Sequence, residues 1–324
     1  MDRNIDISVY ILTYFHERFI RRAIESVLSQ ITNYTYEIVI SDDGSTDGTM
    51  DILREYQKKY PERIVVLHNE KNIGIPKNIY QARCNCRGKY IVHLDGDDYW
   101  ISNEKLEIQA SFLDQHPEFV AVCNRMELRY DNSESPFSIL PKSKDSNVEF
   151  TIKDFERGKT LYNHGFMMRN VFLSSEGRQF FERAQSISSK VDDAVDCLLL
   201  LKYGRVFVLD KVTDAYVVFD KKDNPYNYNS KYSGLTRFEN SIELYSNLYN
   251  EFGDTVSFKR KYISLFSRLV FFCVKNKKNY IYKEFYKDVP KEYKRPFFAG
   301  VKFLSYIDCF MIMIKKVFSK GERI

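Results

Sequence analysis

Hydrophobic and polar residues follow two alternating patterns along the first 130 residues of the chain. Short, nearly unbroken hydrophobic runs predict strands buried on both faces, and hydrophobic positions three and four residues apart predict amphipathic helices. The runs that predict strands are residues 7–12, 37–40, 64–67 and 90–94. The segments with helical spacing are residues 17–29, 46–60, 76–87 and 103–116. Strand and helix therefore alternate, which predicts a parallel sheet with helices on both faces.

The pattern is less regular after residue 116. It predicts further strands at 119–128, 164–169, 206–209 and 213–218, and helices at 151–158 and 190–203. Residues 131–148 are rich in polar side chains and are predicted to form a loop, whereas the spacing from residue 235 to the end is helical. We therefore expect an α/β domain over residues 1–220, in two halves that meet near residue 130, and a helical extension over residues 221–324.

Composition and charge limit the class of protein. Hydrophobic residues make up 44% of the 324, enough for a large core, so a disordered chain is excluded. Residues 255–324 carry 17 Lys and Arg against 5 Asp and Glu, whereas residues 1–254 carry 32 against 39. An acidic body with a basic end argues against a nucleic-acid-binding protein, and it suits a C-terminal segment that meets an anionic surface.

Cysteine usage and the absence of targeting signals bear on the compartment. Six cysteines lie scattered through hydrophobic stretches without a CxxC pair, which predicts reduced thiols and a cytoplasmic protein. The polar first six residues do not resemble a signal peptide. No window of about 18 residues is hydrophobic and uncharged enough to predict a membrane span. The nearest, residues 297–314, contains Lys302 and Asp308.

Acidic residues follow two of the predicted strands at the point where each strand ends. In a parallel sheet, ligands bind outside the carboxyl ends of the strands, so these side chains are expected to meet in one crevice. Asp95, Asp97 and Asp98 follow the strand 90–94, with Gly96 among them. Three carboxylates so close repel one another, and their hard oxygen atoms suit Mg²⁺ or Mn²⁺, which would in turn hold phosphate oxygens. The alternative interpretation is an acidic turn at the surface.

A second acidic pair, Asp42 and Asp43, follows the strand 37–40 and precedes a glycine and two hydroxyl residues. The glycine and hydroxyl residues suit a turn and a helix cap. Neither role requires two carboxylates, so one of the pair is a candidate to accept a hydrogen bond from a nucleobase or a ribose. Gly74, at the start of the third helix, permits close approach of the backbone to an anionic ligand.

Five segments in this order resemble the family-2 glycosyltransferases of the GT-A fold. They are SVYILTY (8–14), AIESVLSQ (23–30), EIVISDDGSTD (37–47), NEKNIG (69–74) and GKYIVHLDGDD (88–98). The resemblance is strong over about residues 5–125, weaker over 150–218, and not recognisable beyond 220. It implies a mixed, mainly parallel sheet flanked by helices, followed here by a helical, basic C-terminal extension. Residues 1–130 would then be the donor half and residues 131–220 the acceptor half.

The resemblance also implies roles for individual residues. Those implied in binding a nucleotide-diphosphate sugar, most often UDP-linked, share positions at strand ends or in the loops that follow: Thr13, Tyr14, Glu17, Asp42, Asp43, Gly74, Asp95 and Gly96. Thr13 would meet the base or ribose, and Asp43, or its neighbour Asp42, would bind the base. Asp95 and Asp97 would form the DxD motif that holds Mn²⁺ or Mg²⁺, with Asp98 assisting.

The family also carries an acidic pair, usually Glu-Asp, at the start of a later helix, whose second member is the general base. Asp192 and Asp193 have that place here, with Asp instead of Glu at 192. We assign the base to Asp193. The alternatives are that both acids only favour the helix dipole, or that Asp196 is the base under a shifted alignment. One displacement by an activated acceptor hydroxyl would invert the anomeric centre without a covalent intermediate.

Three further side chains are weaker candidates. His164, in the predicted strand 164–169, would touch the diphosphate or the acceptor, and His16 lies near the same crevice. Trp100 would stack on a sugar or cover the core. For each histidine the alternative is a structural role.

The C-terminal segment 297–318 has a broad hydrophobic face flanked by lysines. It predicts a helix that packs on the catalytic domain or on a second copy of the chain, or that lies at the inner leaflet of the cytoplasmic membrane. The expected acceptor is a glycan or a polyprenyl-linked glycan of cell-surface polysaccharide synthesis. The competing interpretations are a catalytically inactive, membrane-associated scaffold and a sugar nucleotidyltransferase. The latter would want a glycine-rich loop after the first strand, where residues 13–17 read TYFHE.

Overall fold

The computed structural model describes residues 4–133, 135–159, 161, 165–187, 193–219 and 235–275, together with 287, 289–291 and 294. The chain divides into a sheet unit, within residues 1–151 and 160–230, and a helical unit, within residues 152–159 and 231–324. Residues 152–159, which we expected in the acceptor half, thus group with the C-terminal helices. Among the residues described, none of the helices combines the length and hydrophobicity that a membrane crossing requires.

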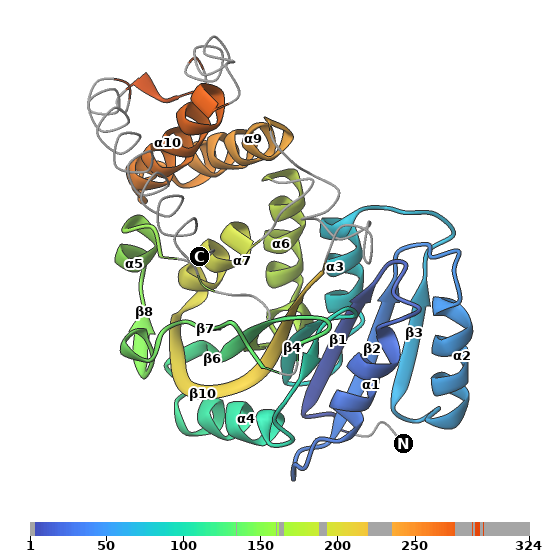
Figure 1. The fold of residues 1–324 in the computed structure, drawn as a ribbon. Coiled ribbons are helices and arrows are strands. Elements are labelled where there is room, and N and C mark those ends of the chain that lie inside the picture. Colours follow the sequence, from blue (N-terminus) through green and yellow to red (C-terminus); the bar gives the residue numbers. More distant parts are fainter. Residues whose placement is uncertain are drawn as a thin grey trace, which may run out of the picture. The chain divides into compact units, whose positions relative to one another are not determined.

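The sheet unit is built on a single sheet whose strands lie in the order β3-β2-β1-β4-β9-β6-β10-β5 (Figure 1). Two further strands join it, because β7 pairs with β6 and β8 pairs with β10. The strands are β1 (Ile7–Thr13), β2 (Tyr36–Asp42), β3 (Ile64–His68), β4 (Tyr90–Asp95), β5 (Tyr99–Trp100), β6 (Phe119–Tyr130), β7 (Ser138–Leu140), β8 (Val148–Phe150), β9 (Phe166–Arg169) and β10 (Arg205–Val218). The helices are α1 (Ile20–Leu28), α2 (Thr49–Lys59), α3 (Ile75–Cys84), α4 (Lys105–Gln115), α6 (Ser175–Ile187) and α7 (Asp193–Tyr203), with 3-10 turns at Ser143–Asp145 and Val171–Leu173.

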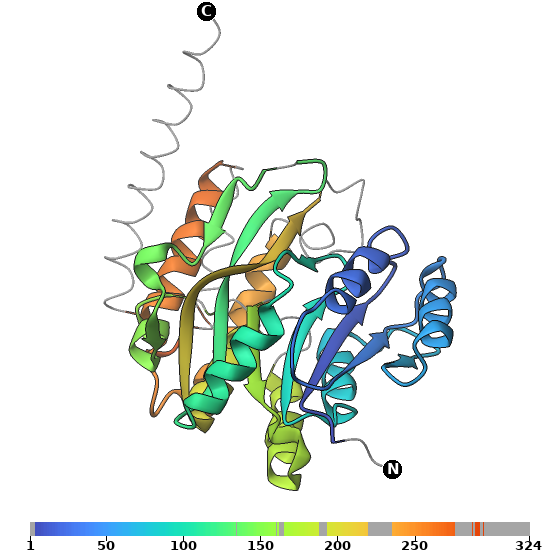
Figure 2. The ribbon, with the colours of Figure 1, turned by 90° about the horizontal axis from the view of Figure 1, so that it is seen from below.

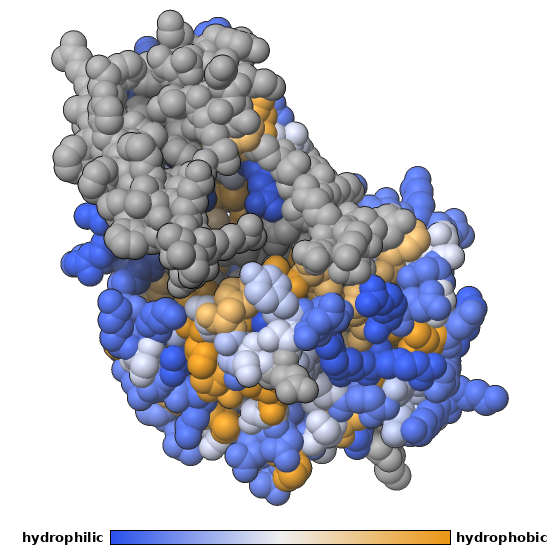
Figure 3. Space-filling model, in the orientation of Figure 1, coloured by the Kyte–Doolittle hydropathy of each residue, from blue (hydrophilic) through white to orange (hydrophobic). Residues whose placement is uncertain are grey.

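Four parallel strands, β3-β2-β1-β4, form one half of the sheet. All of β1 is buried, because helices cover both faces of the sheet. Helices α1, α2 and α4 lie on one face, and α3, α6 and α7 on the other (Figures 1 and 2). With the hydrophobic strands covered, the face of the sheet unit seen in Figure 3 is largely hydrophilic, with hydrophobic side chains in smaller areas between. The expected alternation of strands and helices is confirmed.

The second half of the sheet is mixed. β9 runs antiparallel to both of its neighbours, β4 and β6, so β6 runs in the same direction as β4. β10 is parallel to β6 and therefore shares this direction. As a result the carboxyl ends of β1, β2, β4, β6 and β10 all lie at one edge of the sheet. β10 covers both strands predicted at 206–209 and 213–218, with a bulge between Val208 and Val212.

The helical unit contains α5 (Ile152–Glu156), α9 (Leu235–Phe252) and α10 (Lys259–Lys275). Phe155 of α5 meets Phe258 edge-on, with 6.0 Å between the ring centroids, and the Lys261 ammonium lies 4.4 Å from the centroid of the Phe155 ring. These contacts tie α5 to the start of α10. The predicted helix at 297–318 lies outside the described residues.

Candidate active site

The ends of three neighbouring strands bring the predicted donor-binding residues together at one edge of the sheet. Thr13 at the end of β1 lies beside Asp42 of β2, and Leu12 lies beside Asp95 of β4. Asp43 follows directly, and its backbone N–H donates to the Thr13 carbonyl oxygen at 3.0 Å. The Thr13 hydroxyl is buried and has no hydrogen-bond partner within the described part of the chain, so it can pair with a ligand bound at this edge.

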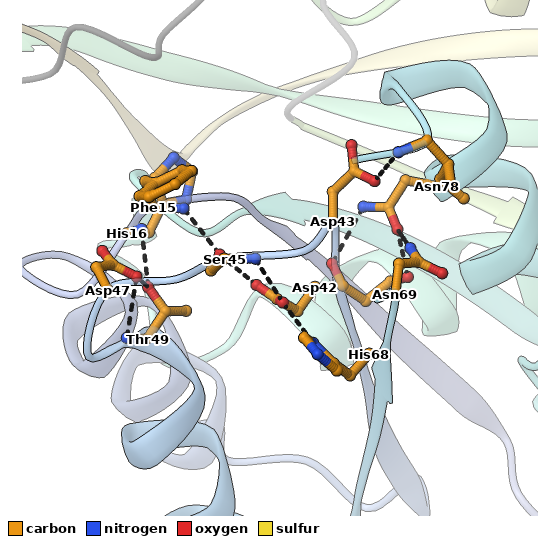
Figure 4. A network of polar contacts seen from close by, with 12 residues as sticks. Phe15, His16, Asp42, Asp43, Ser45, Asp47, Thr49, His68, Asn69 and Asn78 are labelled. Carbon is orange, nitrogen blue, oxygen red and sulfur yellow. Dashed lines mark hydrogen bonds and ion pairs between the residues drawn. The ribbon is translucent and has the colours of Figure 1, made fainter. Parts of the chain in front are cut away.

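Asp42 is fully buried, and its carboxylate shapes the loop that follows β2 (Figure 4). It accepts hydrogen bonds from the Ser45 backbone N–H at 3.0 Å and from the Ser45 hydroxyl, and its Oδ2 lies 2.9 Å from His68 Nδ1. Ser45 Oγ also accepts from the Phe15 backbone N–H at 2.9 Å, and the Phe15 ring meets the Tyr14 ring edge-on. Asp42 therefore fits a role in holding loops better than a role in binding the base.

Asp43 joins the loops that follow β2 and β3. Its Oδ1 accepts from the Ile73 backbone N–H at 2.8 Å, and its Oδ2 accepts from the Gly74 N–H at 3.1 Å. Burial raises the pKa of Asp43 above the ordinary value, although the two N–H donors act in the opposite direction. Gly74 has a φ of 89°, and a Cβ there would meet no protein atom within 4 Å. Within the protein, the positive φ therefore favours glycine at position 74, and steric crowding does not.

The loop between β1 and α1 is fixed to the start of α2. The Glu17 carboxylate accepts from the Gly48 backbone N–H at 3.0 Å. The His16 N–H donates to Thr49 Oγ1 at 3.0 Å (Figure 4). Glu17, which we expected at the donor, thus places its carboxylate at the N-terminus of α2, where the helix dipole favours negative charge.

The acidic turn after β4 places two carboxylates next to histidines. Asp95 Oδ1 lies 3.2 Å from His93 Nε2, and Asp97 Oδ2 lies 3.8 Å from His16 Nε2. The Asp95 side chain is 28% exposed and that of Asp97 is 9% exposed. Asp95 is therefore the more open of the two, while Asp97 lies against the β1–α1 loop.

Gly96 and Asp98 pack the same turn against the sheet. The Gly96 N–H donates to the Leu12 carbonyl oxygen at 2.8 Å, and a Cβ at Gly96 would lie 2.8 Å from His16 Nδ1. Asp98 is buried and accepts from the Val217 backbone N–H at 2.7 Å. Asp98 thus connects the turn to β10.

Asp95 and Asp97 can supply oxygen ligands to a divalent cation. Among the described residues, no three His, Cys, Asp or Glu side chains are arranged as a metal site. Mg²⁺ is commonly bound through one or two protein carboxylates, with water and substrate phosphates in the remaining positions. The donor set of this turn therefore fits a cation that binds together with a diphosphate.

The region expected to hold the base is described only in part. Asp193 begins α7, but its side chain, Asp192 and His164 lie outside the described residues. Asp196, one turn further along α7, is buried and accepts a hydrogen bond from Arg83 Nη1 to its Oδ1 at 2.9 Å. This buried ion pair favours a structural role for Asp196 over the alternative in which it is the base.

In the described part of the sheet unit, two buried cations were not among the residues expected from the sequence. Arg83 lies on α3, and Lys105, on α4, donates to Asp214 Oδ2 at 2.8 Å and to the Gly165 carbonyl oxygen at 3.2 Å. The acidic partners Asp196 and Asp214 lie about a hundred residues away along the chain, so the sequence does not indicate either ion pair. A charged residue on the buried side of a predicted helix was the one feature that could have pointed to them. Trp100 is 4% exposed within the core, which favours the covering role over sugar stacking.

The model of glycosyl transferase family 2 matches residues 8–175, just over half of the chain. The chain belongs to this family, as the sequence motifs predicted. A stretch of 144 residues is 33% identical to an uncharacterized protein of Mycobacterium tuberculosis (strain ATCC 25618 / H37Rv), covering 44% of this chain and 42% of the relative.

A stretch of 111 residues is 34% identical to poly(ribitol-phosphate) beta-N-acetylglucosaminyltransferase TarS of Staphylococcus aureus (strain Mu50 / ATCC 700699). It covers 34% of this chain and 19% of TarS. The match thus spans less than half the length of either relative.

Two solved structures share the fold. The crystal structure of S. aureus TarS 1–349 in complex with UDP-GlcNAc has a TM-score of 0.57 and 18% identity, over 93% of this chain and 91% of that chain. The mannosyltransferase PcManGT from Pyrobaculum calidifontis in complex with GDP-Man and Mn²⁺ has a TM-score of 0.50 and 16% identity, over 77% and 65%. The expected fold class is confirmed: the sheet unit has the GT-A fold, and a helical region follows it.

Proposed function

We propose that this protein is an inverting, metal-dependent glycosyltransferase. It moves a sugar from a nucleotide-diphosphate donor, a UDP-sugar, to a hydroxyl of a glycan or lipid-linked acceptor in cell-surface polysaccharide synthesis. The observation that carries the proposal is the meeting of Thr13, Asp43, Asp95 and Asp97 at one edge of a family-2 domain. The nucleotide sugars in the TarS and PcManGT complexes, and the Mn²⁺ of the latter, support the same donor class and a cation.

The nucleoside would bind between the ends of β1 and β2. The Asp43 carboxylate is held by the N–H groups of Ile73 and Gly74. A carboxylate offers about four lone-pair sites, so Asp43 can still accept a hydrogen bond from an N–H of the base. The Thr13 hydroxyl pairs with the base or the ribose, and Tyr14 lies in the adjoining loop. Asp42 and Glu17 act indirectly, because they hold the loops that carry these groups.

Asp95 and Asp97 would hold the divalent cation, with Asp95 also toward the ribose. When bound, the cation offsets the negative charge that develops on the leaving diphosphate. Gly96 and Asp98 keep the turn against β1 and β10, so the two carboxylates stay in place as the reaction proceeds.

Asp193 is the proposed general base. It takes the proton of the acceptor hydroxyl while the hydroxyl oxygen forms a bond to C1 of the donor sugar. The bond from C1 to the diphosphate oxygen breaks at the same time, and its electron pair leaves with the nucleoside diphosphate. Attack from the face opposite the leaving group inverts C1.

The proposal gives the acceptor to the half formed by residues 131–220. It places the protein in the cytoplasm, as the cysteine pattern predicts. The segment 297–318 would then meet the catalytic domain, a second copy of the chain or the inner leaflet of the membrane.

The test is hydrolysis of a panel of UDP-, GDP- and dTDP-sugars in the presence of Mn²⁺, Mg²⁺ or EDTA. Wild type should release one nucleotide slowly and only with metal, and Asp97→Asn should lower that rate by about a hundredfold or more. Asp51→Asn is the matched control, because the Asp51 side chain on α2 is 83% exposed, and it should leave the rate unchanged. If calorimetry detects no donor binding and no nucleotide is released, the proposal fails and the scaffold interpretation takes its place. If nucleotide is released but neither EDTA nor Asp97→Asn lowers the rate, the metal-dependent mechanism at this turn is contradicted.

A further inference from the structure

Two aromatic rings lie exposed side by side where β6 ends. Tyr130 is 56% exposed and Phe137 is 51% exposed. Their ring centroids are 4.8 Å apart with 30° between the planes, so the rings form one stacked surface. Aromatic rings of this size contribute most when they are covered, and an exposed pair therefore points to a ligand.

The pair lies at the edge of the sheet that carries the candidate active site. β6 runs in the same direction as β4, and Tyr130 pairs with Val218 of β10. The neighbouring Val217 donates its backbone N–H to Asp98, in the acidic turn. The rings are thus joined to that turn through one strand.

Strands β6 and β7 pair antiparallel and form a hairpin, with Tyr130 and Phe137 on either side of its loop. Ion pairs fix the start of this β6–β7 hairpin to the donor half. Asp131 lies 3.5 Å from Arg22 and 3.8 Å from Arg18, both from the region of α1. The Arg22 guanidinium lies 4.3 Å from the centroid of the Tyr99 ring, and Arg129 donates to the Tyr99 hydroxyl at 2.9 Å. The base of the hairpin is therefore positioned relative to Asp97 and Asp98, which immediately precede Tyr99 in the chain.

The chemistry of the hairpin identifies the class of ligand. Between the two rings the chain carries polar and charged side chains and one proline, in the order Asp131, Asn132, Ser133, Glu134, Ser135 and Pro136. A pyranose ring presents a flat C–H face and a rim of hydroxyl groups, which match an aromatic surface bordered by hydrogen-bonding groups. A lipid chain or a hydrophobic peptide would instead bury exposed polar side chains such as that of Asn132, at a cost in desolvation.

We propose that Tyr130 and Phe137 form a platform on which the sugar rings of a glycan acceptor stack. This inference rests on the proposed function, and it assigns the acceptor subsite of that same reaction. It selects a glycan over a simple hydroxyl compound as the acceptor.

The test compares wild type with the double variant Tyr130→Ala/Phe137→Ala. The probes are cellopentaose, chitopentaose and maltopentaose, with binding followed by saturation-transfer NMR and titration. At least one probe should bind wild type, and the double variant should bind it about tenfold more weakly, the effect of about 1.4 kcal/mol of lost stacking. Tyr130→Phe and Phe137→Tyr keep both rings and should retain binding. Ile31→Ala removes an exposed side chain (65%) between α1 and β2 and should change nothing.

Nucleotide release without acceptor separates this inference from the proposed function. All of these variants should keep the wild-type release rate and melting temperature, since both rings are exposed and the contact described for them is with each other. The platform is overturned if no probe binds wild type at millimolar concentration, if the double variant binds as well as wild type, or if the rings instead control sedimentation with anionic vesicles. A wild type that releases no nucleotide but binds a probe through these rings contradicts the transferase proposal and leaves the glycan site standing.

Discussion

Asp42 and Asp43 are adjacent and chemically identical, yet the fold uses them differently. Side chains alternate between the two faces of a strand, so Asp42 shares the α1 and α2 face with Ile38 and Ile40, where it meets Ser45 and His68. Asp43 comes just after the strand and is directed to the loop after β3 instead. A one-residue step therefore separates a carboxylate that holds a loop from one that can meet a ligand.

The raised pKa of Asp43 predicts a pH dependence of stability. The folded chain binds a proton at Asp43 at a higher pH than the unfolded chain does, so folding takes up protons between the two pKa values. As the pH falls through the folded-state pKa toward the unfolded value of about 4, Asp43 adds stability. Asp43→Asn removes this term, so wild type should gain stability relative to the variant on acidification. Urea unfolding of wild type and Asp43→Asn between about pH 7 and pH 4 measures their difference in free energy of unfolding. A difference that does not change with pH would contradict the prediction.

Gly96 offers a steric test at the same scale. A methyl group there would lie 2.8 Å from His16 Nδ1 and 3.0 Å from the Leu12 carbonyl oxygen, so Gly96→Ala should displace the acidic turn. We expect metal-dependent nucleotide release to fall by about a hundredfold, as small misplacements of reacting groups do. In the His16→Ala background the closer contact is absent. Adding Gly96→Ala there should therefore lower the release rate by a smaller factor than it does in wild type. An unimpaired Gly96→Ala enzyme would show that the turn tolerates the shift.

At the scale of elements, a buried ion pair joins α4 to β10. Lys105 is fully buried, and burial lowers its pKa while Asp214 acts to raise it. Lys105 and Gln109 both donate to the Gly165 carbonyl oxygen, at 3.2 and 2.6 Å. Helix α4 thereby fixes the backbone where β9 begins.

Breaking this pair from one side should be costly. Lys105→Met leaves the Asp214 carboxylate buried without its cation, so we expect the free energy of unfolding to fall by about 3–5 kcal/mol. The double variant Lys105→Met/Asp214→Leu removes both charges and should be more stable than Lys105→Met alone. Urea unfolding of wild type, Lys105→Met, Asp214→Leu and the double variant measures the coupling between the two charges. If the two single losses simply add in the double variant, the pair is not coupled.

The sequence predicts the parallel half of this fold well, since β1, β2, β3 and β4 are hydrophobic runs that need no knowledge of their partners. The predicted loop 131–148 contains β7 and the first residue of β8. Each of these strands has only three residues, and its pairing with β6 or β10 is not encoded locally. The helix α6 was missed altogether. β10 was predicted as two strands, because the polar residues of its bulge interrupt the hydrophobic pattern.

At the scale of the whole molecule, the strand-end rule predicts that Thr13, Asp42 and Asp95 lie at one edge of the sheet, and they do. The rule succeeds because it depends only on strand direction. It does not predict which acid meets which partner. Glu17 pairs with Gly48, and Asp98 with Val217, 31 and 119 positions away. The two exposed rings of the β6–β7 hairpin could not be identified either, since exposure depends on what the rest of the chain covers.

The order of strands in space also has a consequence for synthesis. β10 lies between β6 and β5, so both wait for a partner that emerges from the ribosome much later in the chain. Until residue 218 is delivered, a nascent chain carries the hydrophobic strand Phe119–Tyr130 with an open edge, which is prone to pair with other chains. We therefore expect chaperone protection to matter most after β6 has been synthesised and before β10 has been.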